Sequence, residues 1–462
     1  MIFADSAPRL DASVLSDGRT IAAIATPLGR GALAIVRLSG PDVLDMVAKL
    51  LEPASLHARK ASRARVIDPE DGTVLDEVVA TLYRAPHSFT GEDLLEISTH
   101  GGLHTPTAVL AAAIRIGARQ ADAGEFTRRA VLNGKMDLLQ AEAIGDLIDA
   151  RSHVAHRQAI RQLDGGLSAR VRELRERILQ LEALLAYDID FPEEDDGPIP
   201  QERIVRTTEV TLRDLSSLLA TADKGTLIHE GALVVLAGAP NAGKSSLFNA
   251  LLGETRAIVT EISGTTRDAI EAVLDRPLWP LRLVDTAGLR ETSDPLERLG
   301  IETSTRYISR AAVVLACAEH SGETVRIADA VADHTTAPIL EVLTKADLVS
   351  REQYVGSAIR VSARTGEGLS ELLEAVDRCL VGTHGERHED APGLTRARHR
   401  SAVAGAVEEL ERFQNALAQG SIPVSIAAIH VRRAADLLGD LIGVLHTDDI
   451  LDVVFRQFCV GK

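Results

Sequence analysis

The sequence predicts a multidomain protein of mixed α/β and α class. An N-terminal α+β domain is expected, then a bundle of long helices into which a domain with a doubly wound, mostly parallel sheet is inserted. The chain has 462 residues, too many for a single hydrophobic core. Short β-forming runs dominate residues 20–100, and helical periodicity begins at Asp137. A complete α/β pattern interrupts that periodicity at 231–383, which predicts the insertion.

The N-terminal α+β domain is expected at 1–135, where strand patterns precede helical ones. Short runs that are rich in β-forming residues and bounded by Gly, Pro or Asp predict strands at 32–38, 78–83 and 94–98. Helical patterns follow at 106–116 and 124–133. This segment therefore predicts a small sheet accompanied by helices.

The helical domain is expected in two parts, 136–230 and 384–462. In the first part, one apolar face comprises Leu138, Ala141, Ile144, Leu147 and Ile148. A second face alternates steps of four and three, as in helices that pack along their length: Leu167, Val171, Leu174, Ile178, Leu181 and Leu185. In the second part the expected faces are Val403, Val407, Leu410, Phe413 and Leu417, then Ile426, Ile429, Leu437 and Leu441. The two parts are therefore expected to form one bundle.

The inserted domain contains short motifs in the order found in GTPases: GAPNAGKS at 238–245, GTTRD at 264–268, DTAG at 285–288, TKAD at 344–347 and SAR at 362–364. The first motif fits the phosphate-loop pattern, and it follows the apolar run 233–236, as expected of a buried parallel strand. A single motif of this kind is a weak signal, whereas the ordered set predicts a Ras-like P-loop GTPase domain.

The chemistry of these motifs points to a bound nucleotide and a metal ion. Gly238 and Gly243 allow backbone N–H groups to cradle the β-phosphate, and Lys244 adds a positive charge for the β and γ oxygens. The Ser245 hydroxyl suits Mg²⁺, and Asp285 is placed to hold the water shell of that ion. We therefore expect Mg²⁺ together with a nucleoside triphosphate.

The base is predicted to be guanine, because Asp347 can accept its two N–H donors and adenine does not present that pattern. GTP and GDP are thus the expected nucleotides. The predicted GTP-binding residues are Asn241, Ala242, Gly243, Lys244, Ser245, Ser246, Thr260, Glu261, Ile262, Ser263, Gly264, Thr265, Thr266, Asp285, Thr286, Ala287, Gly288, Thr344, Lys345, Asp347, Ser362, Ala363 and Arg364.

Composition excludes several classes of protein. Hydrophobic content of 45% and charged content of 25% are ordinary for a globular protein, and no apolar run approaches the roughly 20 residues that span a bilayer. The N-terminus lacks the pattern of a signal peptide, and the widely spaced cysteines fit neither a disulfide framework nor a zinc site. We therefore expect a cytoplasmic protein without a membrane partner. A net charge of −17 argues against a general nucleic-acid binder.

An arginine-rich stretch at 157–177 is a candidate basic patch, so local binding of nucleic acid stays open despite the negative net charge. A solvated helix face is the simpler interpretation.

Longer segments resemble the MnmE (TrmE) family of tRNA-modification GTPases. They are TPLGRGALAIVRLSG at 26–40, FTGEDLLEISTHGG at 89–102, GEFTRRAVLNGKMDLLQAEAIGDLIDA at 124–150 and FCVGK at 458–462. The resemblance covers nearly the whole chain except roughly its first eighteen residues. It implies an N-terminal domain that dimerises and binds a folate, a helical domain, and a GTPase domain inserted into the latter.

The resemblance also implies partners and chemistry that the motifs alone do not. The homodimer would act with the flavoprotein MnmG (GidA), in a heterotetramer or larger complex, on tRNA. Carbon 5 of the wobble uridine would receive a carboxymethylaminomethyl or aminomethyl group. The one-carbon unit would come from 5-formyl- or methylene-tetrahydrofolate. GTP hydrolysis would require K⁺ and dimerisation of the GTPase domains.

Roles for individual residues follow from the resemblance. The K⁺ ligands would be the Asn241 side chain and the backbone carbonyls of Thr260, Ile262 and Thr265, and Thr266 would join Ser245 on Mg²⁺. The catalytic residues would be Lys244 and Glu297. Leu289, at the position after DTAG, cannot polarise water, so Glu297 is expected to orient the attacking water instead. Without the resemblance, Glu297 is more simply a solvated helix charge.

The folate site implied by the resemblance comprises Arg37, Glu96, Lys135 and Lys462. Arg and Lys suit the carboxylates of a glutamate tail, and a carboxylate suits the N–H groups of a pterin. Taken alone, each of these side chains is equally a surface charge. Cys459 lies close to Lys462 and allows two interpretations, a nucleophile in one-carbon transfer or a small residue that packs the tail.

Thr344 departs from the family pattern, where asparagine is usual. Because threonine lacks the amide that ties this loop to the phosphate loop, we expect weaker nucleotide binding, with guanine selectivity retained by Asp347. The alternative function is a ribosome-assembly GTPase, a switch without modification chemistry. Such proteins usually carry a basic RNA-binding module, whereas the flanks here are helical and acidic.

Overall fold

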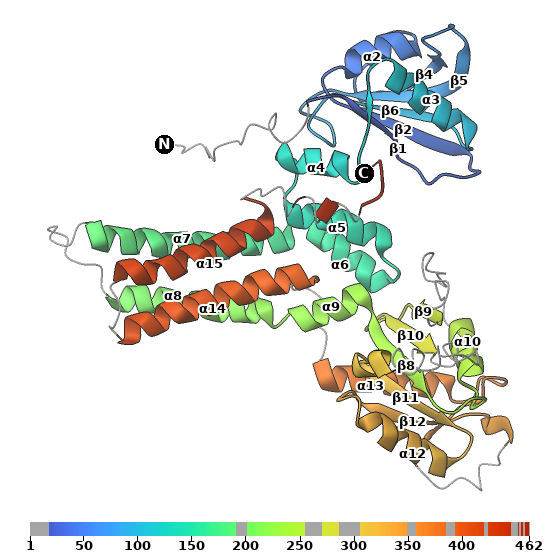
Figure 1. The fold of residues 1–462 in the computed structure, drawn as a ribbon, viewed down its shortest axis with the longest axis vertical. Helices are drawn as coiled ribbons and strands as arrows, with labels where there is room; N and C mark the ends of the chain where they lie inside the picture. Colours follow the sequence, from blue (N-terminus) through green and yellow to red (C-terminus); the bar gives the residue numbers. More distant parts are fainter. Residues whose placement is uncertain are drawn as a thin grey trace, which may run out of the picture. The chain divides into compact units, whose positions relative to one another are not determined.

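The computed structural model describes residues 18–190, 201–254, 270–285, 305–348, 357–384, 393–419, 424–444, 451, 454–455 and 458–461 (Figure 1). Contacts divide the chain into two compact units, Met1–Gly145 with Ile442–Lys462, and Asp146–Leu441. Over the described ranges, every helix is too short or too polar to cross a membrane.

The first unit is built on a sheet with the strand order β3-β4-β5-β6-β2-β1-β7. Its strands are β1 (Ile21–Ile24), β2 (Leu33–Ser39), β3 (Leu51–Glu52), β4 (Ser62–Ile67), β5 (Val74–Tyr83), β6 (Leu94–His100) and β7 (Arg119–Gln120). Neighbouring strands are antiparallel except β1 and β7, which are parallel. The strands expected at 32–38, 78–83 and 94–98 are therefore present as β2, the end of β5, and β6.

The helices α2 (Val43–Leu50) and α3 (His104–Arg115) cover one face of this sheet. On the other face, Phe126 of α4 (Glu125–Leu132) packs with Ile21 and Ala23 of β1, and the start of α5 (Leu138–Asp149) follows. Val47 of α2 and Val109 of α3 share one buried cluster with Val36 and Ile97 of the sheet. The expected α+β domain is thus confirmed. Near the chain's end, Phe455 packs with α4 and α5 in a second cluster.

The second unit combines a helical bundle with an α/β domain. The helices of the bundle are α6 (His153–Leu163), α7 (Gly166–Asp190), α8 (Gln201–Leu219), α9 (Ala222–Glu230), α14 (Ala397–Gln419) and α15 (Val424–Ile442). All six apolar positions of the predicted α7 face, Leu167 to Leu185, are at most 3% exposed. The prediction that this face packs against other long helices is therefore confirmed.

The predicted faces of α15 and α5 are partly wrong. Ile426 and Ile429 are about half exposed, and so is Ile148. The buried stripe of α15 is instead Ala427, Val431, Ala434, Ala435, Leu438 and Leu441. Alanines let neighbouring helices approach closely, so the packed stripe runs through small residues and is rotated away from the isoleucines.

The α/β domain has a sheet with the order β13-β12-β11-β8-β10-β9. Its strands are β8 (Ala232–Ala237), β9 (Ile270–Leu274), β10 (Leu281–Asp285), β11 (Val313–Ala318), β12 (Ile339–Leu343) and β13 (Ile359–Arg360). All pairs are parallel except β9 with β10. β8 is the first strand of this domain in the chain; β10 and β9 are added on one side of it and β11, β12 and β13 on the other, as the predicted doubly wound sheet requires.

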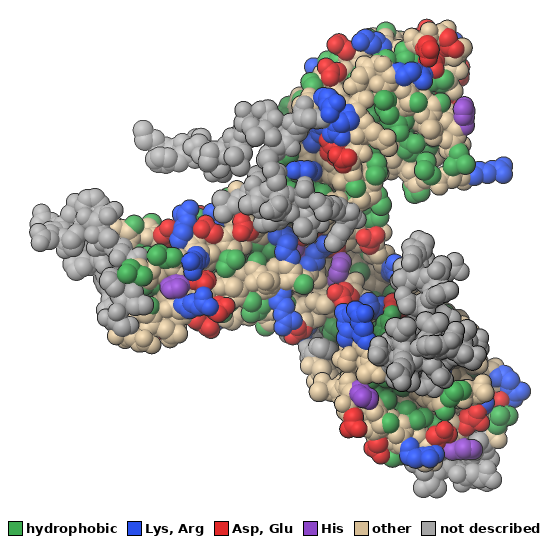
Figure 2. All heavy atoms as spheres, viewed as in Figure 1, with side chains coloured by type: hydrophobic (Ala, Val, Ile, Leu, Met, Phe, Trp, Pro, Cys, Tyr) green, Lys and Arg blue, Asp and Glu red, His purple; other side chains and the backbone are tan. Residues whose placement is uncertain are grey.

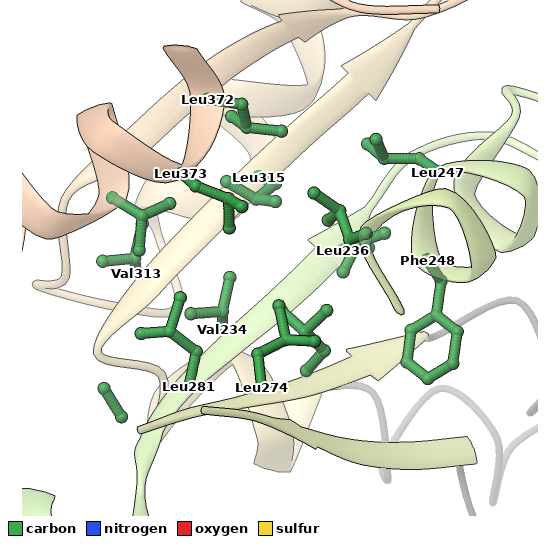
Figure 3. Close-up of a cluster of buried hydrophobic side chains, with 14 of the residues drawn as sticks. Val234, Leu236, Leu247, Phe248, Leu274, Leu281, Val313, Leu315, Leu372 and Leu373 are labelled. Atoms are coloured by element: carbon green, nitrogen blue, oxygen red, sulfur yellow. The ribbon is translucent and has the colours of Figure 1, made fainter. Parts of the chain in front are cut away.

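Helices cover both faces of that sheet, and they are α10 (Lys244–Glu254), α12 (Ser321–Ala332) and α13 (Leu369–His384). Phe248 of α10 and Leu373 of α13 pack with Val234 in the main core (Figure 3). Val331 of α12 packs on the opposite face with Val314. The doubly wound architecture is therefore confirmed.

The chain enters and leaves the α/β domain at one place on the bundle. Gly225 of α9 lies against Leu394, and a Cβ added to Gly225 would stand 1.8 Å from the Leu394 carbonyl oxygen. The Leu394 N–H donates to the Thr221 hydroxyl at 3.1 Å. Nearby, Arg396 forms an ion pair with the buried Asp146. These contacts close the bundle around the insertion.

The amino end of α6 also contacts the α/β domain. Val154 is 1% exposed and belongs to the main core of that domain. The His153 N–H donates to the Asp275 carboxylate at 3.1 Å, so an anion occupies the positive end of the helix. Asp275 lies in the turn between β9 and β10, and that hairpin is therefore joined to the bundle.

Leu181→Ala should lower the free energy of unfolding by about 3 kcal/mol, because it leaves a cavity in a packed helix seam. The control is Ile429→Ala, which should cost under about 0.5 kcal/mol since that side chain is half exposed. Urea unfolding followed by circular dichroism measures both. Similar losses at the two positions would contradict the burial pattern of the bundle.

Candidate functional site

The phosphate loop follows β8 and has the backbone conformation that its glycines permit. Gly238 lies against β11, where an added Cβ would stand 2.2 Å from the Cys317 carbonyl oxygen. Asn241 and Gly243 have φ of 63° and 81°, in the left-handed region. Burial raises the pKa of Cys317 to about 12, so its thiol stays neutral beneath the loop.

Lys244 and Ser245 are the first residues of α10. The buried Lys244 ammonium donates to the carbonyls of Gly238 and Ala239 at 2.9 and 2.8 Å. The Ser245 hydroxyl donates to the Asp285 carboxylate at 2.5 Å. Hydroxyl and carboxylate oxygens are ligands that Mg²⁺ prefers, and it needs only one or two of them beside nucleotide phosphates. The residues present therefore fit a magnesium ion.

The predicted guanine-binding segment, 344–347, lies beyond the carboxyl end of β12. Ser362 donates to one oxygen of Asp347 at 2.7 Å, and Arg364 pairs with the other at 2.9 Å. The Ser362 hydrogen bond, with a smaller contribution from the Arg364 charge, lowers the pKa of Asp347. The carboxylate therefore stays ionised as an acceptor of N–H groups.

The hydrogen bonds of Thr344 differ from what the sequence led us to expect. We expected threonine to leave this loop untied, yet the buried Thr344 hydroxyl lies 2.8 Å from the Ala242 carbonyl oxygen of the phosphate loop. It also lies 3.1 Å from the Ala318 carbonyl oxygen, and its single proton can serve only one of the two at a time. The hydroxyl thus makes the tie for which an amide was thought necessary.

The described part of the predicted nucleotide site gathers at one edge of the sheet. Parallel strands β8, β10, β11 and β12 end there, as ligand sites of this architecture do. The remaining predicted positions lie outside the described residues: Thr260, Glu261, Ile262, Ser263, Gly264, Thr265, Thr266, Thr286, Ala287, Gly288 and Glu297.

In the first unit, the predicted folate residues Arg37 and Glu96 stand opposite each other on β2 and β6. Arg37 donates to the same Glu96 oxygen from Nε at 3.0 Å and from Nη2 at 2.7 Å. The guanidinium carbon lies 5.6 Å from the ring centres of Phe89 and of Phe126. Sequence reasoning missed these rings, since nothing local in the sequence shows that they flank an arginine.

The C-terminal tail reaches the same place. Val460 forms an antiparallel bridge with Ala123, and the Gly461 carbonyl accepts from Arg37 Nη1 at 3.4 Å. Gly461 fits closely, because an added Cβ would stand 2.6 Å from the Ile24 carbonyl oxygen. Lys462 lies outside the described residues. The tail is therefore held beside Arg37 up to the last position before Lys462.

Cys459 precedes this bridge and has an exposed side chain. Its carbonyl accepts from the Gly124 N–H at 3.3 Å. The interpretation in which the thiol packs the tail is therefore wrong for this side chain, because the backbone makes the contact instead.

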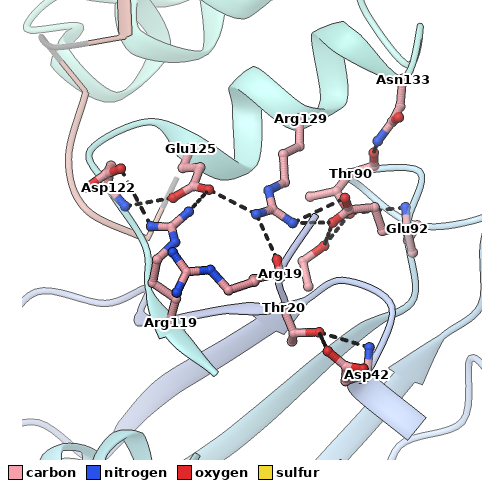
Figure 4. Close-up of polar contacts among 12 residues, drawn as sticks. Arg19, Thr20, Asp42, Thr90, Glu92, Arg119, Asp122, Glu125, Arg129 and Asn133 are labelled. Carbon is pink, nitrogen blue, oxygen red and sulfur yellow. Dashed lines mark hydrogen bonds and ion pairs between the residues drawn. The ribbon is translucent and has the colours of Figure 1, made fainter. Parts of the chain in front are cut away.

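The loop that contributes Phe89 also contacts Lys135, whose ammonium donates to the Pro86 carbonyl at 2.9 Å. Figure 4 shows Arg129 of α4 between Glu92 and Glu125, at 3.1 and 3.0 Å. Arg129 is almost fully buried, so these charges are paired away from water. The network fixes the loop, and with it the surroundings of Arg37.

The arginine-rich stretch behaves as a solvated helix face where its contacts are known. Arg177 pairs with Asp214 at 2.6 Å and with Glu173 at 2.5 Å. Arg175 donates to the Ala435 carbonyl at 3.2 Å. Figure 2 shows acidic and basic side chains interspersed over the bundle. These pairs favour a mixed-charge surface over a basic patch.

Comparison with known proteins gives consistent matches. The family model described as "MnmE helical domain" matches residues 138–459, and that described as "GTP-binding protein TrmE N-terminus" matches 20–135. Proteins named "tRNA modification GTPase MnmE" are similar to this chain. That of Aquifex aeolicus is 42% identical, covering 96% of this chain and 99% of its own length, and that of Moorella thermoacetica is 41% identical with the same coverages.

Solved structures match less well. The G domain of the T. maritima FeoB iron transporter covers 32% of this chain and 98% of its own, at 25% identity and a TM-score of 0.25, which is too low to support a conclusion.

Thr344→Val should weaken GDP binding about tenfold, because it removes the hydroxyl that ties the loop to Ala242 and leaves a buried carbonyl unpaired. Thr344→Ser keeps the hydroxyl and is the matched control, expected to bind like the unmodified protein. Thr344→Asn should also stay within about threefold, since its amide would replace a bond that already exists. Titration with a fluorescent GDP analogue measures all three. Normal affinity in Thr344→Val would show that the tie does not affect nucleotide binding.

Proposed function

The chain belongs to the MnmE family of tRNA modification GTPases, and we propose that it hydrolyses GTP in the modification of tRNA. The observation that carries this proposal is the contact between Ser245 and Asp285 beside the buried Lys244. Three side chains that a triphosphate and its metal ion require stand at the carboxyl edge of one sheet. Proteins named tRNA modification GTPase MnmE match the chain over nearly its whole length.

In the proposed reaction the protein mainly positions the nucleotide and neutralises the charge on its phosphates. Backbone N–H groups of the phosphate loop face the β-phosphate, and Lys244 turns its donors from the loop carbonyls to phosphate oxygens. Ser245 and Thr266 would be the protein ligands of Mg²⁺, and Asp285 would hold the water shell of that ion. When bound, the ion neutralises charge on the phosphates. Asp347 selects guanine, and Glu297 orients the attacking water.

A K⁺ ion is part of the proposal. Its ligands would be the Asn241 side chain and the carbonyls of Thr260, Ile262 and Thr265. Asn241 is the one among them that lies in the described ranges, and its amide oxygen is the neutral kind of ligand that a large monovalent cation suits. Its left-handed backbone, at φ 63°, is a constrained position consistent with a functional role.

Folate chemistry is proposed for the first unit, with Arg37, Glu96, Lys135 and Lys462 as the binding residues. Arg37 has five N–H donors, and within the described part of the chain three of them bind Glu96 and Gly461, which leaves two for acceptor atoms of the ligand. Glu96 accepts both of its Arg37 bonds on Oε1, so Oε2 can accept from a pterin. A tetrahydrofolate one-carbon donor therefore fits these residues.

The full reaction we propose requires the flavoprotein MnmG (GidA), in a heterotetramer or larger complex. The product would be a carboxymethylaminomethyl or aminomethyl group on carbon 5 of the wobble uridine of certain tRNAs. The proposed domain limits are 1–135 for folate binding and dimerisation, 136–230 and 384–462 for the helical domain, and 231–383 for the GTPase.

A homodimer is proposed, formed in part by the first unit. Leu28 and Leu33 lie before or at the start of β2, Leu103 lies after β6, and all three are largely exposed. The loops that carry them are joined by the hydrogen bond from the Gly101 N–H to the Ala32 carbonyl at 3.1 Å. Exposed leucines on adjoining loops support an apolar contact with a second copy.

The proposal is tested by analysing tRNA nucleosides from a strain that lacks this gene. Loss of the substituent at carbon 5 of the wobble uridine, restored by the intact protein but not by Lys244→Ala, is the expected result. Normal tRNA with immature ribosomal subunits would favour the ribosome-assembly function instead. Because the two outcomes concern different RNAs, the experiment separates the two functions.

Steady-state GTP hydrolysis should rise at least tenfold when K⁺ replaces Na⁺, because the ion supplies positive charge where it develops in the transition state. Asn241→Ala should remove that difference. Asn249→Ala, an exposed substitution on α10, is the matched control and should keep it. Equal rates in both salts would refute the requirement for K⁺ while leaving the GTPase itself intact.

A further inference from the structure

A carboxylate outside the five motifs contacts the guanine-binding segment. Glu319 follows β11 directly, and its Oε1 forms an ion pair with the Lys345 ammonium. Lys345 stands between Thr344, which contacts the phosphate loop, and Asp347, which accepts the base. Glu319 is therefore well placed to influence nucleotide binding, although it follows β11 whereas Lys345 follows β12.

The backbone around Lys345 is fixed on both sides. The Thr344 N–H donates to the Ala318 carbonyl at 2.8 Å, and the Ala346 N–H donates to the Val361 carbonyl at 3.0 Å. Lys345 itself has φ of 53°, a left-handed conformation that a side chain with a Cβ adopts only under constraint. The direction in which its side chain leaves the loop is thus set by these flanking bonds.

The ion pair then fixes the other end of the side chain. Both partners are about 40% exposed, and pairs this exposed contribute little to folding stability. Their effect on binding is different, because a free lysine has many rotamers that it loses when a ligand packs against its stem. A lysine whose ammonium is already held by an ion pair has fewer rotamers to lose when the ligand binds.

We propose that Glu319 is a positioning residue of the nucleotide site. It holds Lys345 extended, so that the methylene stem forms a fixed wall of the base pocket between Thr344 and Asp347. This inference rests on the proposed function, in which guanine binds at this segment. A carboxylate acting only through its charge would repel the nucleotide phosphates, so the two roles predict opposite effects when the charge is removed.

The test is Glu319→Gln in the full-length protein, titrated with a fluorescent GDP analogue. Positioning predicts binding weaker by about threefold to tenfold, the scale of one immobilised side chain. The KM for GTP should rise by a similar factor while kcat is unchanged, and the melting temperature should not move. Unchanged or tighter binding would overturn the proposal.

Glu374→Gln is the matched control. Glu374 forms an exposed pair with Arg378 on α13, so its removal should leave GDP binding unchanged. In a Lys345→Met background, Glu319→Gln should have no further effect, because the group that it positions is absent. An equal loss in both backgrounds would contradict action through Lys345. If the unmodified protein bound no GDP, both the proposed function and this inference would be wrong. If the unmodified protein and Glu319→Gln bound GDP equally well, only the inference would be wrong.

Discussion

The contact of Gly225 with the Leu394 carbonyl is the constraint on which the second unit depends. A complete α/β domain can be inserted into a helical bundle only if its two connections meet, and here they meet at a distance that admits no side chain. Thr221 and Asp146 reinforce the junction through Leu394 and Arg396. With the connections closed, α14 packs on α8 as though the chain were continuous. The nucleotide-binding edge and the bundle thus become parts of one compact unit.

The nucleotide site also depends on close backbone contacts, which small or conformationally constrained residues make possible. Gly238 brings the phosphate loop against β11, and Thr344 ties that loop to the predicted guanine-binding segment. Asn241 takes a left-handed conformation between Gly238 and the tied Ala242, and Lys345 does so between the backbone hydrogen bonds of Thr344 and Ala346. Each strained position lies between bonds that fix it, so the site is shaped before a nucleotide arrives. Asp275 then links the hairpin between β9 and β10 to the amino end of α6.

In the first unit, residues from the two ends of the chain share one site. Arg37 holds Glu96, lies near two aromatic rings and donates to Gly461, which lies 424 positions away in sequence. The tail is held by its backbone, through the bridge at Val460, which leaves the side chain of Cys459 exposed.

The sequence by itself determined the fold class and the family and predicted the nucleotide-binding residues, because these are expressed in motifs and periodicities of neighbouring residues. The seam from Leu167 to Leu185 is an example, since four-and-three spacing specifies one face of a helix. Tertiary structure alone decided which stripe of α15 is buried, because alanines and isoleucines compete for the core and only the packing partner selects between them. It also decided that Thr344 ties the phosphate loop and that Phe89 and Phe126 flank Arg37. Those contacts join residues that are far apart in the chain, and the residues next to each of them in sequence do not indicate that the two meet in space.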